Sequence, residues 1–206
     1  MPENNDAVLT AGAGWVFLAD ANTASPTDVE VSPLSGGFDP SDLAVDWVPV
    51  GHTSREDLPE FGSDGGDTEV RGSWQNAALR QVVTETAVDS VTLNLLQFDN
   101  DTLALYYGQA NAMVNGERRF RVKSSPSGTV EKALLVVIVD GDVSIGFYAP
   151  NASFKREDAI SLAVDYFGAL PVRATFLQGY SGTDTTDNRL LFDWIGGEIE
   201  APDETP

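Results

Sequence analysis

The residues best suited to chemistry lie in one short stretch of the chain. "GHTSREDLPEFGSDGGDTEVRG" (51–72) holds the only histidine, His52, and six carboxylates within 22 positions. A Ser-His-Asp triad needs a histidine beside an activated serine, and no nucleophile-elbow motif occurs in the sequence. We therefore interpret His52, near the expected end of a strand, as a surface or hydrogen-bonded polar residue.

Metal sites are poorly supported by the spacing of possible ligands. A zinc site needs three or four His, Cys or acidic ligands, and the chain has one histidine and no cysteine. An EF-hand loop needs oxygen ligands at positions 1, 3 and 5 and glycine at position 6. The loops that start at Asp99, Asp64 and Asp184 each place an unsuitable residue at one of these positions. We predict no metal ligand, although calcium between acidic loops stays open.

Hydrolysis of sugars by paired carboxylates also stays open, but 32 acidic residues make that signal uninformative. Sugar-binding sites usually expose tryptophan, whereas Trp15, Trp47, Trp74 and Trp194 lie in strand-like runs that predict core positions. No glycine-rich loop is followed by the lysine and helix of a phosphate site. We predict no catalytic residue, no cofactor and no enzyme.

The charge balance is extreme, at 32 acidic against 12 basic residues and a net charge of −20. Broad neutralisation of DNA phosphates needs a basic surface, so this composition argues against duplex DNA as a bound ligand. Neither a charged secretory leader nor an 18-residue apolar run is present. The sequence predicts a soluble protein without a membrane span, made and kept in the cytoplasm of the producing cell.

One basic cluster stands out against this acidity. "ERRFRVK" (117–123) predicts a strand over 117–124 with Arg119, Arg121 and Lys123 on one face. One interpretation is an edge strand guarded by charge. The other is a basic patch that receives an acidic segment from a neighbouring copy.

Hydrophobic residues recur with the period of β-strands along most of the chain. "SVTLNLLQF" (90–98) and "GDVSIGFYA" (141–149) alternate, and "ALLVVIV" (133–139) is apolar on both faces, as in a doubly covered strand. Asp140-Gly141 predicts a type I′ hairpin turn between the last two. Further strands are predicted at 14–19, 45–53, 67–75, 79–88, 117–124, 161–167, 171–178 and 189–195.

One segment has the hydrophobic spacing of a helix, and three segments have no regular hydrophobic spacing. Leu103, Tyr106 and Tyr107 in "DNDTLALYYGQ" predict a short helix near 100–108, capped by Asp99 or Asn100 and closed by Gly108. Residues 20–44, 54–66 and an acidic, proline-containing tail at 198–206 predict irregular structure. The fold class is mainly β, with two packed antiparallel sheets, one short helix and extended loops.

Phrases spread over roughly residues 10 to 198 resemble the major tail tube proteins of long-tailed bacteriophages, particularly those that infect actinobacteria. They include "VGHTSREDLPEFGSDGGDTEVRGSWQNAALR", "VDSVTLNLLQFDNDTLALYYG" and "EKALLVVIVDGD", followed by "YAPNASFKREDAISLAVDYFGAL". The resemblance implies a sandwich or barrel of two sheets flanked by a helix. It also implies that six copies form a ring, that inner strands join into one barrel, and that stacked rings form the tube through which DNA leaves the virion.

The resemblance gives the opening stretch another meaning. It implies a single domain over 1–198 with an N-terminal arm and a long loop near 53–67 that reaches neighbouring copies, followed by a disordered tail at 199–206. Leu58 and Phe61 become candidate apolar anchors of that loop. The candidate interface residues are Leu58, Phe61, Asp64, Asp67, Arg119, Arg121 and Lys123. Implied partners are the chain itself, the tail tip or initiator, the terminator, the tape measure, and DNA that passes without specific binding.

Three alternatives remain beside a tail tube located in the virion. They are another β-rich virion part such as a terminator or decoration protein, a monomeric sugar-binding sandwich, and a carboxylate-based hydrolase. A related bacterial secretion-tube protein would share the fold and the ring.

Overall fold

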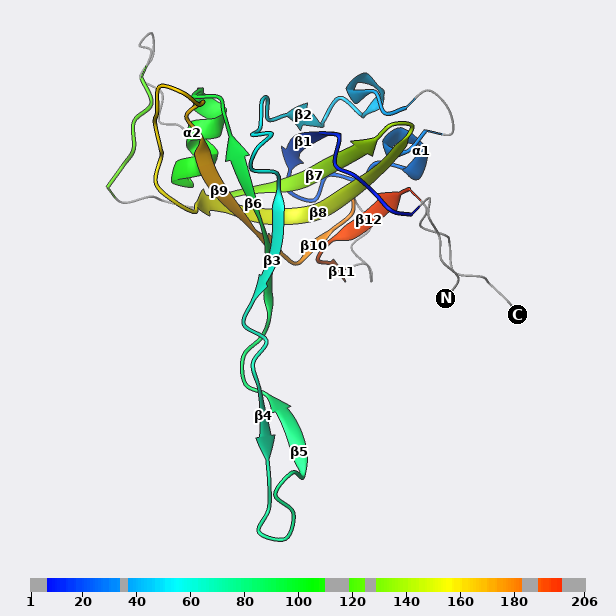
Figure 1. The fold of residues 1–206 in the computed structure, drawn as a ribbon, viewed down its shortest axis with the longest axis vertical. Coiled ribbons are helices and arrows are strands. Elements are labelled where there is room, and N and C mark those ends of the chain that lie inside the picture. The colour runs from blue at the N-terminus through cyan, green and yellow to red at the C-terminus, as the bar shows by residue number, and fades with distance from the viewer. Residues whose placement is uncertain (1–6, 34–36, 110–118, 125–128, 183–188, 198–206) are drawn as a thin grey trace, which may run out of the picture.

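The strands form one large antiparallel sheet and two small ones. The computed structural model describes residues 7–33, 37–109, 119–124, 129–182 and 189–197 (Figure 1). The large sheet has the order β2-β1-β7-β8-β9-β6-β3, and β12 also pairs with β8. Its strands are β1 (Ala13–Asp20), β2 (Val48–Pro49), β3 (Glu60–Asp64), β6 (Val88–Leu95), β7 (Val130–Asp140), β8 (Val143–Arg156), β9 (Leu170–Leu177) and β12 (Asp193–Gly196).

The small sheets each contain two strands. They pair β4 (Thr68–Arg71) with β5 (Arg80–Val83), and β10 (Gly179–Tyr180) with β11 (Arg189–Leu190). The helical elements are α1 (Asp28–Val31), η1 (Pro40–Asp42) and α2 (Asn100–Tyr107). The prediction of a mainly β fold is confirmed, and over the described ranges the large sheet stays open rather than closing into a barrel.

Both faces of the sheet are covered at its centre, as the apolar run 133–139 predicts. Leu134 and Val136 of β7 point into one core, which β6, β9 and α2 complete. The alternate residues Leu135 and Val137 point into a second core, which includes Val31 of α1. Because successive side chains of a strand face opposite sides, a strand between two cores has to be apolar throughout.

The hairpin between β7 and β8 forms, but its turn lies one residue later than predicted. Asp140 is the last residue of β7 and pairs with Val143, so the central residues are Gly141 and Asp142. Gly141 has a φ of 61°, whereas Asp142 does not have a positive φ. A positive φ at the first central residue alone is the pattern of a type II′ turn rather than type I′.

A bulge bends β8 in its middle. Lys132 of β7 pairs with Ala152, but Leu134 pairs with Ala149, so two residues of β8, one of them Pro150, oppose a single residue of β7. Proline has no amide hydrogen to donate, so a bulge suits it. On its other edge, β8 pairs with β12 before the bulge and with β9 after it.

The predicted short helix is confirmed with its caps. The Asp99 carboxylate accepts hydrogen bonds from the Asp101 and Thr102 amides, and Gly108 ends α2 in the left-handed conformation. Tyr106 anchors the helix, since its hydroxyl donates to the Asp158 carbonyl at 2.8 Å. Two turns of helix are too short to persist alone, and this packing holds them against the sheet.

Several predicted strands are wrong or shorter. Residues 119–124 and 161–167 contain no strand, and only Val48–Pro49 of 45–53 is one. The region 20–44, predicted irregular, contains α1, whose Thr27 and Glu30 form a reciprocal capping box. The tail at 199–206 and residues 1–6 of the N-terminal arm lie outside the described residues.

Candidate assembly surface

A long hairpin projects from the body of the protein. We call residues 65–87 the arm; it contains β4 and β5 and extends far beyond the large sheet (Figure 1). Gly65 and Gly66, with φ of 79° and 80°, form the joint between β3 and β4. Non-glycine residues rarely adopt a positive φ, so the adjacent glycines allow the chain to leave the sheet there.

The predicted loop 53–67 is therefore ordered in part and ends where the arm begins. Residues 60–64 are not irregular but form β3, which pairs with β6 along five residues, from Glu60 opposite Thr92 to Asp64 opposite Val88. β3 thus extends the large sheet by one strand beyond β6. The segment that projects from the body is therefore 65–87 rather than 53–67, and the role of 53–67 in assembly stays a prediction.

The arm exposes apolar side chains on a thin support. Every residue of β4 is exposed, as are Arg80, Gln81 and Val83 of β5. The exposed apolar residues of the arm are Val70, Trp74, Leu79 and Val83, and Trp74 is 100% accessible. An isolated two-stranded hairpin is marginally stable in water. Burial against another chain would remove this surface from water and stabilise the arm.

Trp74 is thus not a core residue, contrary to the sequence interpretation. The strand-like pattern over 67–75 is real in part, since 68–71 form β4, but this strand belongs to a hairpin that packs on no other element among the described residues. Trp47 is buried and Trp15 half-buried as expected, whereas Trp194 keeps 38% of its surface exposed. The glycine, serine and asparagine around Trp74 are the sequence signal that could have indicated a turn tip.

The tip of the arm is held by a local hydrogen-bond network. The amides of Ser73 and Asn76 each donate to the other's carbonyl, at 2.7 and 3.2 Å, and the Ala78 amide donates to the Asn76 side chain at 3.1 Å. A Cβ atom at Gly72 would lie 2.4 Å from the Ala77 carbonyl oxygen. These contacts fix the direction in which the tip presents Trp74.

One guanidinium secures the base of the arm. Arg173 of β9 forms an ion pair with Asp64 at the end of β3 and a second with Glu157, 3.3 Å away. Its Nε donates to the buried Ser90 hydroxyl at 3.0 Å. The predicted interface residue Asp64 therefore has an internal partner that ties β3 to the sheet.

The other predicted residues of this stretch also have contacts within the chain. The ring of Phe61 lies 4.6 Å from that of Phe147 and 5.5 Å from that of Trp194, between centroids, and keeps 36% of its surface exposed. Leu58 is exposed and lines an apolar cavity of about 420 Å³ beside β1 and β7. The Asp67 carbonyl accepts from the Thr84 amide at 2.8 Å across the arm.

The basic segment lies beside α2 without forming a strand. The backbone of Lys123 pairs with the side chain of Gln109. Its amide donates to Gln109 Oε1 at 3.0 Å, and its carbonyl accepts from Gln109 Nε2 at 3.2 Å. Phe120 stacks on Tyr107 with centroids 5.9 Å apart. Arg119, Arg121 and Lys123 are exposed, but they do not share a strand face.

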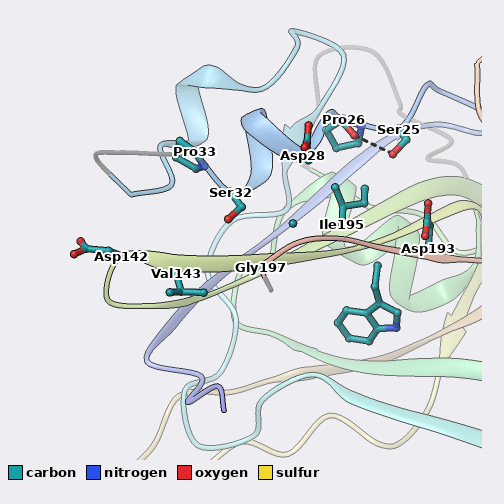
Figure 2. A pocket seen from close by; sticks show the side chains of 12 residues that line it. Ser25, Pro26, Asp28, Ser32, Pro33, Asp142, Val143, Asp193, Ile195 and Gly197 are labelled. Atoms are coloured by element: carbon teal, nitrogen blue, oxygen red, sulfur yellow. Dashed lines mark hydrogen bonds between the residues drawn. The ribbon is translucent and has the colours of Figure 1, made fainter. Parts of the chain in front are cut away.

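Two hollows in the body are lined by both polar and apolar residues. Figure 2 shows the first, about 500 Å³, where Asp28, Asp142 and Asp193 come from α1, the β7–β8 turn and β12 and lie at separate places around the hollow. The second, about 830 Å³, includes Asp20, whose pKa is lowered by a 2.7 Å hydrogen bond from the Lys132 ammonium and by its charge.

Neither a metal site nor a membrane helix emerges from the part of the chain that the structure describes. No three His, Cys, Asp or Glu residues gather there as a possible ligand set. No described helix is long and apolar enough to cross a membrane.

The sequence matches known proteins along its whole length. The family model for phage tail tube proteins matches residues 1–205. The major tail protein Gp23 of Mycobacterium phage D29 is 46% identical over 201 residues, which cover 97% of this chain and 96% of that protein. The major tail protein Gp23 of Mycobacterium phage L5 is 44% identical over 207 residues, which cover 100% and 99% of the two chains.

Proposed function

The chain belongs to the phage tail tube protein family, and from that premise we propose that six copies close into a ring and that the rings stack into a conduit for DNA ejection. The protein is a structural component of the virion tail. Its relatives over nearly the full length are named major tail proteins, which favours this role over a terminator, a decoration protein or a sugar-binding module.

The arm is the feature that carries this proposal. Trp74 and three other apolar residues stand on a hairpin with no described packing partner. Exposed apolar surface on a projecting element is typical of an interaction site, and tryptophan is enriched among residues that dominate interface energies. The arm is therefore suited to bury these side chains against another copy.

The open sheet supports lateral association within a ring. The described path ends at β2 on one side and at β3 on the other. Edge strands offer unpaired amides and carbonyls to a neighbour. A ring that joins sheets from successive copies would remove these edges, as a closed barrel does.

The acidity suits a wall that DNA must pass. We propose that carboxylates dominate the lumen and repel phosphates, so that DNA passes without specific binding and no catalysis occurs. The screening length is about 8 Å in physiological salt, so the repulsion acts close to the wall. Replacing lumen-facing acids by lysine should slow genome ejection, and unchanged ejection kinetics would contradict this role.

The same charge opposes assembly. Six copies at −20 each give a ring of about −120. Salt screens this repulsion, so ring and tube formation should strengthen as ionic strength rises. Light scattering across a salt series measures this dependence, and tubes that form better at low ionic strength would contradict it.

Electron microscopy of the purified chain tests the proposal directly. We expect hollow rings or tubes with sixfold ends from the full chain, alone or seeded with tail tips. The matched control replaces residues 67–85 by two glycines, which removes the arm and spares both cores. The control should stay folded but fail to form tubes. A full chain that forms neither rings nor tubes with seeds would refute self-assembly, and tubes from the control would refute the role of the arm.

The remaining partners follow from the position of such a tube in the tail. We propose contacts with the tail tip or initiator at one end, with the terminator at the other, and with the tape measure inside. The exposed basic residues Arg119, Arg121 and Lys123 remain candidates for pairing with acidic segments of neighbouring copies.

A further inference from the structure

A second exposed apolar surface lies on the body, in the loop between β8 and β9. We call residues 157–168 the receptor loop. Its exposed apolar side chains are Leu162, Val164, Tyr166 and Phe167, joined by the exposed Phe98. The large side chain of Phe167, for example, keeps 79% of its surface accessible. So much apolar surface in one short loop indicates a binding site.

The receptor loop is held in shape rather than left open. Ser161 and Ala169 form an isolated antiparallel bridge at its base, and the hydroxyls of Ser161 and Tyr166 lie 3.1 Å apart. A Cβ atom at Gly168 would lie 2.6 Å from Leu162 Cδ2 and 3.5 Å from the Phe98 ring, so both side chains flank this glycine. A preformed surface loses little entropy when a partner binds.

Charge identifies the partner. The arm tip, residues 71–80, carries Arg71 and Arg80 and no carboxylate, and Arg71 also pairs with Glu69 just before the tip. The receptor loop carries Glu157, Asp158 and Asp165 and no basic residue. The two surfaces are thus apolar at the centre and opposite in charge, the combination that gives complementary interfaces.

The two surfaces cannot meet within one copy. In Figure 1 the tip lies at the lower end of the longest axis, and the receptor loop lies beside α2 at the upper end. The hydrogen bond from the Tyr106 hydroxyl to the Asp158 carbonyl keeps the loop next to α2. Two complementary surfaces at opposite ends of a molecule make a heterologous, head-to-tail contact, which can pass from copy to copy along one direction.

We propose that the arm tip of one copy docks onto the receptor loop of another copy, with Trp74 placed among Leu162, Phe167 and Phe98. This contact rests on the proposed function, since it supplies the link between successive rings. Arg71 and Arg80 lie at the rim, beside the acidic residues of the loop. The arm contributes the aromatic anchor and the body contributes the preformed surface.

Site-directed cross-linking tests the contact. The chain has no cysteine, so Gln75→Cys at the tip and Ala163→Cys in the loop create the only thiols, and both positions are exposed. The doubly substituted full chain, treated with a short bismaleimide, should give a ladder of multimers. Either substitution alone should not. The matched control pairs Gln75→Cys with Val29→Cys, an exposed site on α1, which lies across the large sheet from α2 and the receptor loop (Figure 1).

The anchor is tested in the same assay. Adding Trp74→Ala or Phe167→Ala to the doubly substituted chain should reduce the ladder about thirtyfold, the loss expected when a central aromatic contact is removed. A second test mixes two variants, neither of them cross-linked. Trp74→Ala/Leu79→Ala keeps the receptor loop intact, and Leu162→Ala/Phe167→Ala keeps the tip intact. The mixture should therefore restore one contact per pair of copies. Each variant alone should restore none. A tip-to-tip contact would instead let the second variant associate alone.

The outcomes separate this contact from the tube itself. Rings or tubes without a ladder above the Val29 control would overturn the contact and leave the tube proposal intact. A ladder without rings or tubes would support the contact and count against the tube proposal. Absence of both, with tail-tip seeds present, would overturn both.

Discussion

Replacing Arg173 by methionine should loosen the base of the arm. Arg173 is the meeting point of three segments, because it contacts Asp64 at the end of β3, Ser90 in β6 and Glu157 at the start of the receptor loop. Methionine keeps much of the apolar stem and removes the guanidinium. The effect of this substitution therefore reports the polar contacts.

Two different contributions add up in the expected loss. The Ser90 hydroxyl is buried, and a buried polar group left without its partner costs about 1–3 kcal/mol. The carboxylate of Asp64 is 71% exposed and that of Glu157 is 34% exposed. Solvent-screened pairs of this kind contribute about 0–1 kcal/mol each. The free energy of unfolding should fall by about 2–3 kcal/mol in total.

Urea unfolding followed by tryptophan fluorescence measures this change. The matched control is Arg71→Met, which removes the Arg71–Glu69 pair on the arm, where both side chains are more than half exposed. It should cost less than about 1 kcal/mol. Hydrogen exchange should accelerate in β3 and at the first residues of β6 in the Arg173 variant only. An Arg173→Met loss no greater than that of Arg71→Met would refute the assignment of Arg173 as the anchor.

Three further substitutions test separate parts of the structure. Gly72→Ala should disrupt the tip and abolish tube formation in electron micrographs while circular dichroism of the body stays unchanged, because its Cβ would lie 2.4 Å from the Ala77 carbonyl oxygen. Tyr148→Phe should cost about 1 kcal/mol in urea unfolding, since the Tyr148 hydroxyl donates to the Thr23 carbonyl at 2.6 Å. Burial raises the pKa of Tyr148 above its usual value of 10. The contribution of its neutral hydroxyl to the free energy of unfolding is therefore complete below pH 10 and is lost as pH rises through the higher folded-state pKa. The phenylalanine variant should lack this alkaline loss of stability. Phe147→Ala should cost about 3–5 kcal/mol by the same method, because its ring lies at the centre of an aromatic cluster.

Sequence patterns located those elements whose form follows from local chemistry. The doubly apolar run of β7 and the alternation in β6 each follow from which faces are covered. The caps of α2 follow from the hydrogen-bonding capacity of Asp99 and the conformational freedom of Gly108. Such features need no knowledge of the remote parts of the chain.

Patterns failed where a remote side chain decided the structure. The basic residues at alternate positions of 119–123 suggested a strand. In the structure, the Gln109 side chain pairs with the Lys123 backbone and Phe120 stacks on Tyr107. The apolar residues of 161–167 suggested a strand as well. In the structure, a single bridge between Ser161 and Ala169 closes this segment into a loop.

The seven candidate interface residues stay predictions, although several of them have contacts within the chain. Phe61 was predicted as an anchor for a neighbour, yet it packs on Phe147 and Trp194 because β3 pairs with β6. Trp74 was predicted as core, since a strand pattern does not tell whether anything covers the strand. Whether Leu58, Phe61, Asp64, Asp67 and the basic residues of 119–123 contact other copies stays a prediction.

Net charge and local charge act at different distances in the proposed assembly. Two chains of charge −20 repel each other as they approach, but in physiological salt this repulsion decays over about 8 Å. At contact, the relevant groups are those that face each other, and the tip has no carboxylate while the receptor loop has no basic residue. A tip with carboxylates or a loop with lysines would add short-range repulsion that salt screens poorly. The separation of charge between these two segments therefore lets a strongly acidic chain bind a copy of itself at one surface while it repels that copy elsewhere.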